Sequence, residues 1–338
     1  MTDSGIKNLL VRPQGGWLSD NAHGTLHIGL LNNMADAALE STERQFFRLF
    51  GSAAREHRIC WHLFSLRSVA RSESGYLHLI HQNYGSPGDL YNTRLDALIV
   101  TGTEPVQSNL REEVYWPELS TVFDWIEQEG PPAILSCLAA HAAVLHYDGV
   151  ERRRLPQKRC GSFDHIRASD HPLTAPLPAP VKVAHSRWNE VPVDSLTAAG
   201  YEILTYAPEA GADLFAKRRR NTLLFIQGHP EYDADTLARE YRRDVRRYLA
   251  GASKEYPRMP RHYFEQHEVE VLERFGHRAL RERDERLFGE FPPLPPRASG
   301  VGSMAPVFGN WLREIDAGRN GRNTNAPRHR ALPEMRAP

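Results

Sequence analysis

The sequence predicts an α/β fold in which a mainly parallel sheet carries helices on both faces, followed by a helical C-terminal extension. Between His23 and Gly251, short apolar runs rich in branched residues alternate with stretches of helical periodicity. Such runs are typical of buried strands, and strands that alternate with helices favour parallel pairing. The composition agrees with a packed core, because 41% of the 338 residues are hydrophobic and 25% are charged.

The apolar runs indicate both the strands and the positions of a site. The expected strands are residues 26–31, 59–66, 97–100, 133–135, 181–184 and 222–226. In open α/β sheets, ligands bind beyond the carboxyl ends of the strands. The residues that follow the runs are therefore candidates: 32–33, 101–102, 137, 185–187 and 227–231.

Two segments carry clear helix signals. Thr42 and Gln45 have the spacing of a capping box, which predicts a helix that starts there and ends at Gly51. A second helix is expected from about 235 to 250, because apolar residues recur there at helical spacing before Gly251.

Charge and cysteine content exclude several classes of protein. Lys plus Arg total 42 and Asp plus Glu total 42, so no net positive charge favours nucleic acid or an anionic membrane. The three cysteines form no C-x-x-C pair, and the N-terminal residues lack the apolar core of a signal peptide. We therefore expect a soluble, cytoplasmic protein. No metal site is expected, since His78 with His81 and His262 with His267 lack a third donor at ligand spacing.

Cys137 lies between an expected strand and a stretch of small residues with helical character. A thiolate at this junction faces the positive end of the helix dipole, next to N–H groups that can receive an oxyanion. That position suits a nucleophile. The alternative interpretation is a small core residue, as many unpaired cysteines are. Cys60 is expected in the core, whereas Cys160 is expected to be exposed, without a base nearby in the sequence.

His229 and Glu231 supply the matching base. His229 follows an expected strand, which puts it at the same sheet edge as Cys137, and Glu231 is two residues on, so both side chains point to one side in extended backbone. A carboxylate beside an imidazole fixes its tautomer and stabilises the imidazolium. The alternative is an ordinary Gly-His-Pro turn with a capping acid.

Several segments together resemble the homoserine O-succinyltransferases, which are homoserine transacylases on the class I glutamine-amidotransferase fold. These segments are LLNNMADAALESTERQFFRLFG, ALIVTGTEP, YWPEL, SCLAAHAAVLHYDGV, AHSRWNEVP, GHPEYDADTLAREYRRD and GNWLREI, in this order. The resemblance extends from about residue 26 to 315. We expect a catalytic domain at 23–255 after an N-terminal segment at 1–22. The charged residues after Gly251 predict a helical extension at 256–316, and the scarcity of apolar residues predicts a disordered tail at 317–338.

The resemblance also implies roles for individual residues. Cys137 takes the acyl group from an acyl-CoA as a thioester, His229 is the general base and Glu231 is its partner. Lys158 and Ser186 match substrate-contacting residues, and Arg243 matches the arginine that holds the amino-acid carboxylate. Taken alone, Lys158 is an ordinary surface lysine, Ser186 an ordinary strand end, and Arg243 part of a solvated helix face.

The expected reaction is ping-pong transfer of a succinyl or acetyl group to the hydroxyl of L-homoserine in methionine biosynthesis. Acyl-CoA is a co-substrate, no bound cofactor is expected, and we expect a homodimer. Ala35–Ala37 replace a Pro-Lys-Lys run that the family usually has near the donor, and Leu138 replaces a common tryptophan. Residues 103–108, in the region where the family chooses its acyl group, do not align cleanly, so the choice between succinyl and acetyl stays open. Serine as the acceptor, a glutamine amidotransferase or hydrolase of the same fold, and a non-catalytic binding protein are the alternatives.

Overall fold

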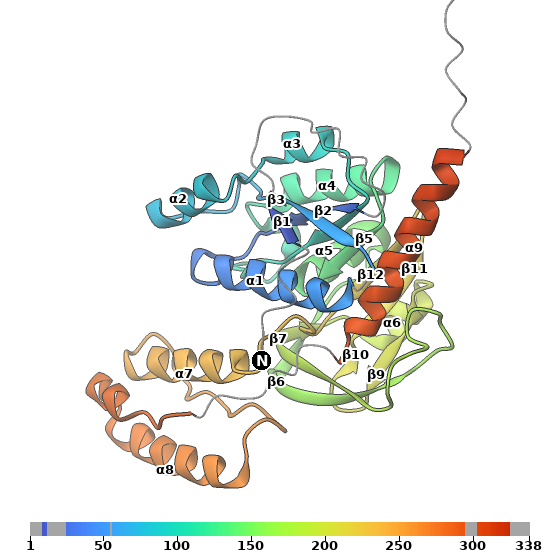
Figure 1. Ribbon diagram of the computed structural model, residues 1–338. Helices are drawn as coiled ribbons and strands as arrows, with labels where there is room; N and C mark the ends of the chain where they lie inside the picture. Colours follow the sequence, from blue (N-terminus) through green and yellow to red (C-terminus); the bar gives the residue numbers. More distant parts are fainter. Residues whose placement is uncertain (1–8, 12–24, 55, 295–302, 325–338) are drawn as a thin grey trace, which may run out of the picture.

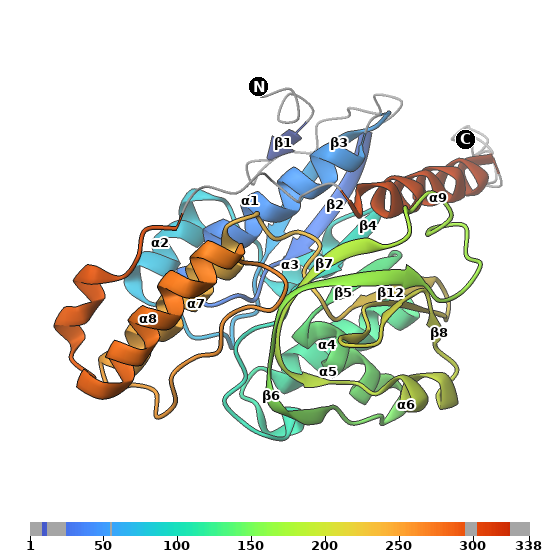
Figure 2. The same cartoon turned by 90° about the horizontal axis from the view of Figure 1, so that it is seen from below.

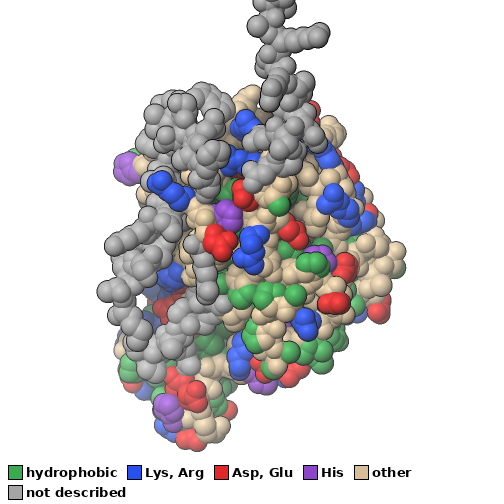
Figure 3. Space-filling model, turned by 45° about the vertical axis from the view of Figure 1, so that its right-hand side comes forward, with side chains coloured by type: hydrophobic (Ala, Val, Ile, Leu, Met, Phe, Trp, Pro, Cys, Tyr) green, Lys and Arg blue, Asp and Glu red, His purple; other side chains and the backbone are tan. Residues whose placement is uncertain are grey.

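The computed structural model describes residues 9–11, 25–54, 56–294 and 303–324 (Figures 1 and 2). Within these residues an eight-stranded sheet carries helices on both faces, and a four-stranded sheet lies beside it. Among the described helices, none has the length and apolar character needed to cross a membrane. Where the surface in Figure 3 is coloured, acidic and basic side chains are interspersed, as the balanced composition predicts.

The central sheet is mainly parallel, which confirms the predicted fold class. Its strands, in spatial order, are β1 (Leu9–Val11), β3 (Arg58–Phe64), β2 (Thr25–Leu31), β4 (Ala97–Val100), β5 (Ala133–Ser136), β12 (Thr222–Ile226), β11 (Leu214–Arg218) and β8 (Glu202–Ile203). Pairing is parallel from β1 to β12 and antiparallel from β12 to β8. Because β5 and β12 are neighbours, the residues that follow them share one edge of the sheet.

Both faces of this sheet are covered. Leu26, Ile28 and Leu30 of β2 point to the face packed by α1 (Asp36–Ala53) and α9 (Ala305–Thr324). The opposite face packs against α4 (Trp116–Gln128) and α5 (Leu138–Asp148). The shorter described helices are α2 (Glu73–His81), α3 (Pro87–Asn92), α6 (Val193–Ala198) and the 3₁₀ turns η2 (Leu110–Glu112) and η3 (Glu285–Glu290).

The predicted start and end of the first helix are wrong. Helix α1 begins at Asp36, so Thr42 is a buried interior residue, and it continues past Gly51 to Ala53. Good helix formers at 37–40 extend the helix backwards. A glycine inside a helix costs only about 1 kcal/mol, and the burial of Phe50 and Ala53 outweighs that cost.

The second sheet was not predicted. It is antiparallel, with the order β10 (Gly211–Ala212), β9 (Thr205–Ala207), β6 (Arg153–Arg167) and β7 (Val181–Glu190). Residues 181–184 were expected in the parallel sheet with 185–187 beyond its edge, but all of them lie within β7. Burial alternates along β6 and β7, so neither strand has the continuous apolar pattern of a sandwiched strand.

Strand β7 nevertheless reaches the edge of the central sheet. Ala184 forms a bridge with His229 in the loop after β12, where the His229 N–H donates to the Ala184 carbonyl at 2.8 Å. This contact joins the two sheets at the position of the expected base.

The C-terminal helices depart from the expected organisation in two ways. Helix α7 (Thr236–Leu249) shares a hydrophobic cluster with α8 (Gln266–Glu282), so the boundary expected after 255 cuts through a packed unit (Figure 2). Helix α9 continues to Thr324, beyond the expected end at 316, and Arg319 donates to the Thr25 carbonyl at 2.6 Å. This hydrogen bond joins the last turns of α9 to β2. Residues 317–324 are therefore helical, although they were expected to be disordered. Residues 325–338 lie outside the described part of the chain.

Candidate active site

Cys137 lies on a tight turn between β5 and α5. Its backbone has φ 52° and ψ −112°, a strained conformation for a residue with a side chain. The Cys137 N–H donates to the Ile226 carbonyl of β12 at 2.7 Å, which fixes the turn to the neighbouring strand. The side chain therefore stands at the N-terminus of α5, where unpaired N–H groups face the sulfur.

His229 and Glu231 lie on the loop after β12, beside this turn. His229 Nδ1 is 2.8 Å from Glu231 Oε1, and the side chains of Cys137 and His229 share a hydrogen bond. Glu231 is buried, and the His229 ring is nearly so. The structure thus aligns a thiol, an imidazole and a carboxylate in the order needed for nucleophilic catalysis.

Burial and charge act in opposite directions on His229. Burial disfavours the imidazolium, but Glu231 and Cys137 favour it more, so the pKa of His229 is raised well above its ordinary value. His229 therefore carries a proton over a wider pH range than an ordinary histidine. Tyr232 stacks on the ring with centroids 4.2 Å apart and holds its orientation.

A buried arginine adds positive charge near the sulfur. Arg187 on β7 is 4% exposed, and its guanidinium donates to the carbonyls of Asn189 and Ala210 at 2.8 and 2.5 Å. Burial and the neighbouring Arg159 lower the pKa of Arg187 to about 10, while Cys137 and Glu190 oppose that shift. Arg187 stays cationic near neutral pH and stabilises negative charge on Cys137.

Gly102, which follows β4, lets its loop pack against the start of α5. A Cβ at this position would lie 2.4 Å from the Leu138 Cβ and 3.0 Å from the Leu138 nitrogen. Leu138 is the first residue of α5, so its N–H has no acceptor within the helix. The close approach leaves this N–H beside Cys137, in position to bind an oxyanion.

Lys158 and Ser186 both contact acidic residues of α7 near His229. Ser186 donates a hydrogen bond to Glu240, which also accepts from Tyr232 at 2.9 Å. Lys158 Nζ lies 3.0 Å from Asp244 and 3.9 Å from Glu240. Tyr232 therefore connects this group of charges directly to the stacked His229.

Arg243 joins the same group from the solvent side. Its guanidinium binds the Asp244 carboxylate at 2.9 and 3.0 Å, and half of its side chain is exposed. Burial raises the pKa of Asp244, but Lys158 and Arg243 lower it more, so Asp244 is ionised. Of the three predicted binding residues, Lys158 and Ser186 are largely enclosed and Arg243 is at the rim.

A family model described as homoserine O-succinyltransferase matches residues 19–284. The chain belongs to the homoserine O-succinyltransferase family. A homoserine O-succinyltransferase of Rhodopseudomonas palustris is 47% identical over 85% of this chain and 87% of its own length. One from Bradyrhizobium japonicum is 45% identical over 92% and 96%, respectively. Membership of this family makes the protein a transferase.

Among solved structures, a glutamine amidotransferase from Methylobacillus flagellatus covers 86% of this chain and 94% of its own, with a TM-score of 0.47 and 12% identity.

Other residues that were predicted to follow the strands form hydrogen bonds at the edge of the sheet. The Asn33 N–H donates to Thr101 Oγ1 at 2.8 Å, and the Leu66 N–H donates to Asn33 Oδ1 at 3.2 Å. The Gln227 side-chain oxygen accepts from the Val191 N–H at 2.9 Å and lies 3.0 Å from His141 Nε2. Burial lowers the pKa of His141 to about 3, so this histidine is neutral.

Sequence reasoning missed the acidic partners of the site and misplaced one cysteine. Glu240 and Asp244 are four residues apart on one face of α7, and this spacing was the available signal. Cys160 is buried rather than exposed, and it lies opposite Ser186 in the pairing of β6 and β7. Cys60 is buried in β3 as predicted. His78 lies 2.6 Å from Glu43, and His262 lies 3.1 Å from Glu209.

Proposed function

We propose that the protein transfers a succinyl group from succinyl-CoA to the hydroxyl of L-homoserine through a thioester on Cys137. The observation that carries this proposal is the alignment of Cys137 on its strained turn with the His229–Glu231 pair. Membership of the family, whose relatives are named for succinyl transfer to homoserine, supplies the acyl group and the acceptor.

In the first half-reaction, the Cys137 thiolate attacks the thioester carbonyl of the donor. The Leu138 N–H binds the oxyanion that forms, and the new bond joins Cys137 Sγ to the acyl carbon. The bond from that carbon to the CoA sulfur then breaks, and His229 gives its proton to the departing thiolate. The products are acyl-Cys137 and free CoA.

In the second half-reaction, His229 removes the proton from the homoserine hydroxyl as its oxygen attacks acyl-Cys137. The bond between the acyl carbon and Cys137 Sγ breaks, which restores the thiolate beside a protonated His229. Glu231 stabilises the imidazolium formed in this step. Two acyl transfers through one thioester give ping-pong kinetics.

The charges around α7 suit an amino acid as the acceptor. Homoserine carries a carboxylate and an ammonium group, and this part of the site offers both signs of charge. Arg243 is partly exposed and can bind the carboxylate with its planar guanidinium, as the family resemblance implies. Glu240 and Ser186 lie deeper and are suited to the ammonium and hydroxyl groups.

Some features of this proposal rest on the resemblance alone. These are the place of the reaction in methionine biosynthesis and a homodimer. A cytoplasmic location rests instead on the cysteine content and the N-terminal sequence, and all three stay predictions. Acetyl-CoA as donor and serine as acceptor are the alternatives within the same chemistry.

The deciding experiment mixes the purified protein with succinyl-CoA or acetyl-CoA, with and without homoserine or serine. CoA thiol release and the mass of the intact protein are followed together. We expect succinyl-CoA alone to release about one equivalent of CoA and to leave one adduct, which homoserine then discharges.

Matched variants identify the nucleophile. Cys137→Ala should form no adduct, whereas Cys160→Ala, which removes another buried thiol, should still form it. Glutamine hydrolysis without acyl transfer would instead support an amidotransferase. Absence of both the adduct and thiol release in the wild type would exclude this function.

A further inference from the structure

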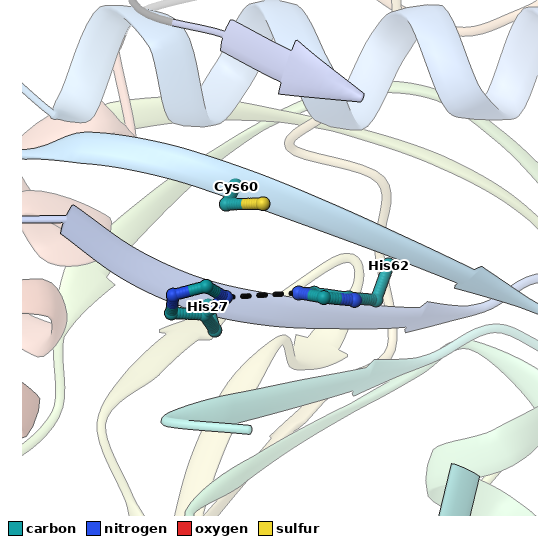
Figure 4. Close-up of side chains that lie close together, drawn as sticks. All are labelled: His27, Cys60 and His62. Atoms are coloured by element: carbon teal, nitrogen blue, oxygen red, sulfur yellow. Dashed lines mark hydrogen bonds between the residues drawn. The ribbon is translucent and has the colours of Figure 1, made fainter. Parts of the chain in front are cut away.

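Two neighbouring strands place a cysteine and two histidines together, far along the chain from the catalytic residues. In the parallel pairing of β2 and β3, His27 lies opposite Cys60 and Gly29 lies opposite His62. Residues opposite one another, and residues two apart on one strand, point to the same face of a sheet. His27, Cys60 and His62 therefore share one face (Figure 4).

The ligand atoms of these residues are close enough to bind one ion. His27 Nδ1 lies 3.0 Å from His62 Nε2. One ring nitrogen of each histidine and the Cys60 sulfur all lie within 4.8 Å of one another. Ideal tetrahedral zinc, with Zn–N near 2.1 Å and Zn–S near 2.3 Å, separates two nitrogens by about 3.4 Å and a nitrogen from a sulfur by about 3.6 Å. Small side-chain rotations would bring the present geometry to these values.

The surroundings of the cluster favour metal binding at this position. Rigid strands hold all three residues, and the His27 N–H donates to the Asp96 carboxylate at 2.9 Å, which fixes the backbone of β2. Leu95, Leu98 and Phe64 pack close to Gly29, so apolar side chains lie beside the cluster. His27 and His62 are partly exposed, whereas Cys60 is buried, so an ion can enter past the imidazoles.

The cluster is separate from the active site. Catalytic residues follow the carboxyl ends of β5 and β12, whereas His27 and Cys60 lie within β2 and β3, before those strands reach the same edge. A metal here would join β2 to β3 and would take no part in acyl transfer.

We propose that His27, Cys60 and His62 form a binding site for a thiophilic divalent cation, Zn²⁺, with a fourth position for water. Two imidazoles and a thiolate are ligands that zinc prefers. The Cys60 thiol loses its proton on binding. The proton shared between His27 Nδ1 and His62 Nε2 moves to a ring nitrogen that faces away from the metal.

The test uses the full-length chain in a Cys137→Ser background, because Cys137 with His229 and Glu231 is another set of possible zinc ligands. Zinc content is measured after loading and gel filtration, and Co²⁺ is titrated as a spectroscopic probe. We expect about one zinc per chain and a sulfur-to-cobalt charge-transfer band. Cys60→Ser should remove the band, and His62→Gln should weaken zinc binding by ~10-fold or more.

The matched control is Cys160→Ser, which removes the other non-catalytic buried thiol and should leave the band and the zinc content unchanged. Circular dichroism spectra establish that each variant is folded, and His27→Gln replaces any variant that is not. Zinc content that is the same in Cys60→Ser and in its parent, or cobalt spectra without a thiolate band, would overturn the proposal.

Discussion

Ser186 on β7 donates a hydrogen bond to Glu240 on α7. The same carboxylate accepts from Tyr232, whose ring stacks on His229, so one acidic side chain connects the proposed acceptor site to the proposed base. A substitution of Glu240 can therefore distinguish the two half-reactions, because only the second half-reaction uses homoserine.

Glu240→Gln keeps the size of the side chain but leaves one acceptor oxygen where Ser186 and Tyr232 now use two, and it removes the negative charge beside Lys158. Loss of a charged hydrogen-bond partner costs ~1.5–3 kcal/mol, so we expect KM for homoserine to rise by ~10-fold or more. The burst of CoA released from the donor alone should be unchanged. Glu270→Gln on the exposed side of α8 is the control. An equal loss in the burst would show that Glu240 acts on Cys137 chemistry instead.

Gly102→Ala should damage catalysis more than stability. The new Cβ would push against Leu138 and move its N–H away from the oxyanion. Removal of one oxyanion donor lowers kcat by ~10²–10³-fold, and we expect a loss in that range for the thioester-forming step. Gly289→Ala, where a Cβ meets nothing within 4 Å, should keep wild-type rates. Single-turnover CoA release measures the effect, and an unimpaired Gly102→Ala would remove Leu138 from the mechanism.

Glu231→Gln should change how stability depends on pH. Burial opposes protonation of His229, but Glu231 and Cys137 raise its pKa well above the ordinary value. A group with a raised pKa stabilises the fold fully below its unfolded pKa of about 6.5, and that stability is lost as the pH rises through the folded pKa. The wild type should therefore exceed Glu231→Gln in free energy of unfolding most at about pH 6, and less toward about pH 9.

Urea denaturation at several pH values measures this difference. Glu270→Gln should differ from the wild type by an amount that does not vary in the same way with pH. The wild type could instead exceed Glu231→Gln in free energy of unfolding by an amount that grows as the pH rises. That result would contradict the raised pKa of His229.

Trp311→Ala should destabilise the whole protein. Trp311 on α9 is 1% exposed and contacts Phe50 of α1 edge-on, with ring centroids 6.0 Å apart. Truncation of a buried tryptophan costs ~3–5 kcal/mol. Arg313→Ala on the exposed side of α9 should cost less than about 0.5 kcal/mol. Denaturant unfolding compares the two, and similar small losses would mean that α9 is not part of the cooperative core.

Five strands of the central sheet, β2, β3, β4, β5 and β12, were predictable because they are buried on both faces and read as continuous apolar runs, whereas β1, β8 and β11 were not predicted. The turn at Cys137 and the loop at His229 followed from those runs, since parallel strands bring their carboxyl ends to one edge. Strand β6 was not predictable in this way, because one of its faces is polar and its sequence has no apolar run.

The site around α7 was predictable only in part. Helical periodicity located α7, but Glu240 and Asp244 acquire partners from β6 and β7, which lie far away in the sequence. The cluster of His27, Cys60 and His62 depends on the register between β2 and β3, and single-sequence periodicity does not determine that register.

The order of the chain separates two strands that are adjacent in space. The proposed nucleophile follows β5 and the proposed base follows β12, yet β6, β7, β8, β9, β10 and β11 all come between them in the sequence. The chain between β5 and β12 includes Lys158 and Ser186, and the bridge between Ala184 and His229 joins this part of the chain to the loop that holds the proposed base. Two of the proposed acceptor contacts, Lys158 and Ser186, therefore lie on strands other than those that precede the thiol and the imidazole, and the other two, Glu240 and Arg243, lie on α7. We therefore expect acceptor preference to change when β6, β7 and α7 are exchanged together between relatives, while β5 and β12 are kept.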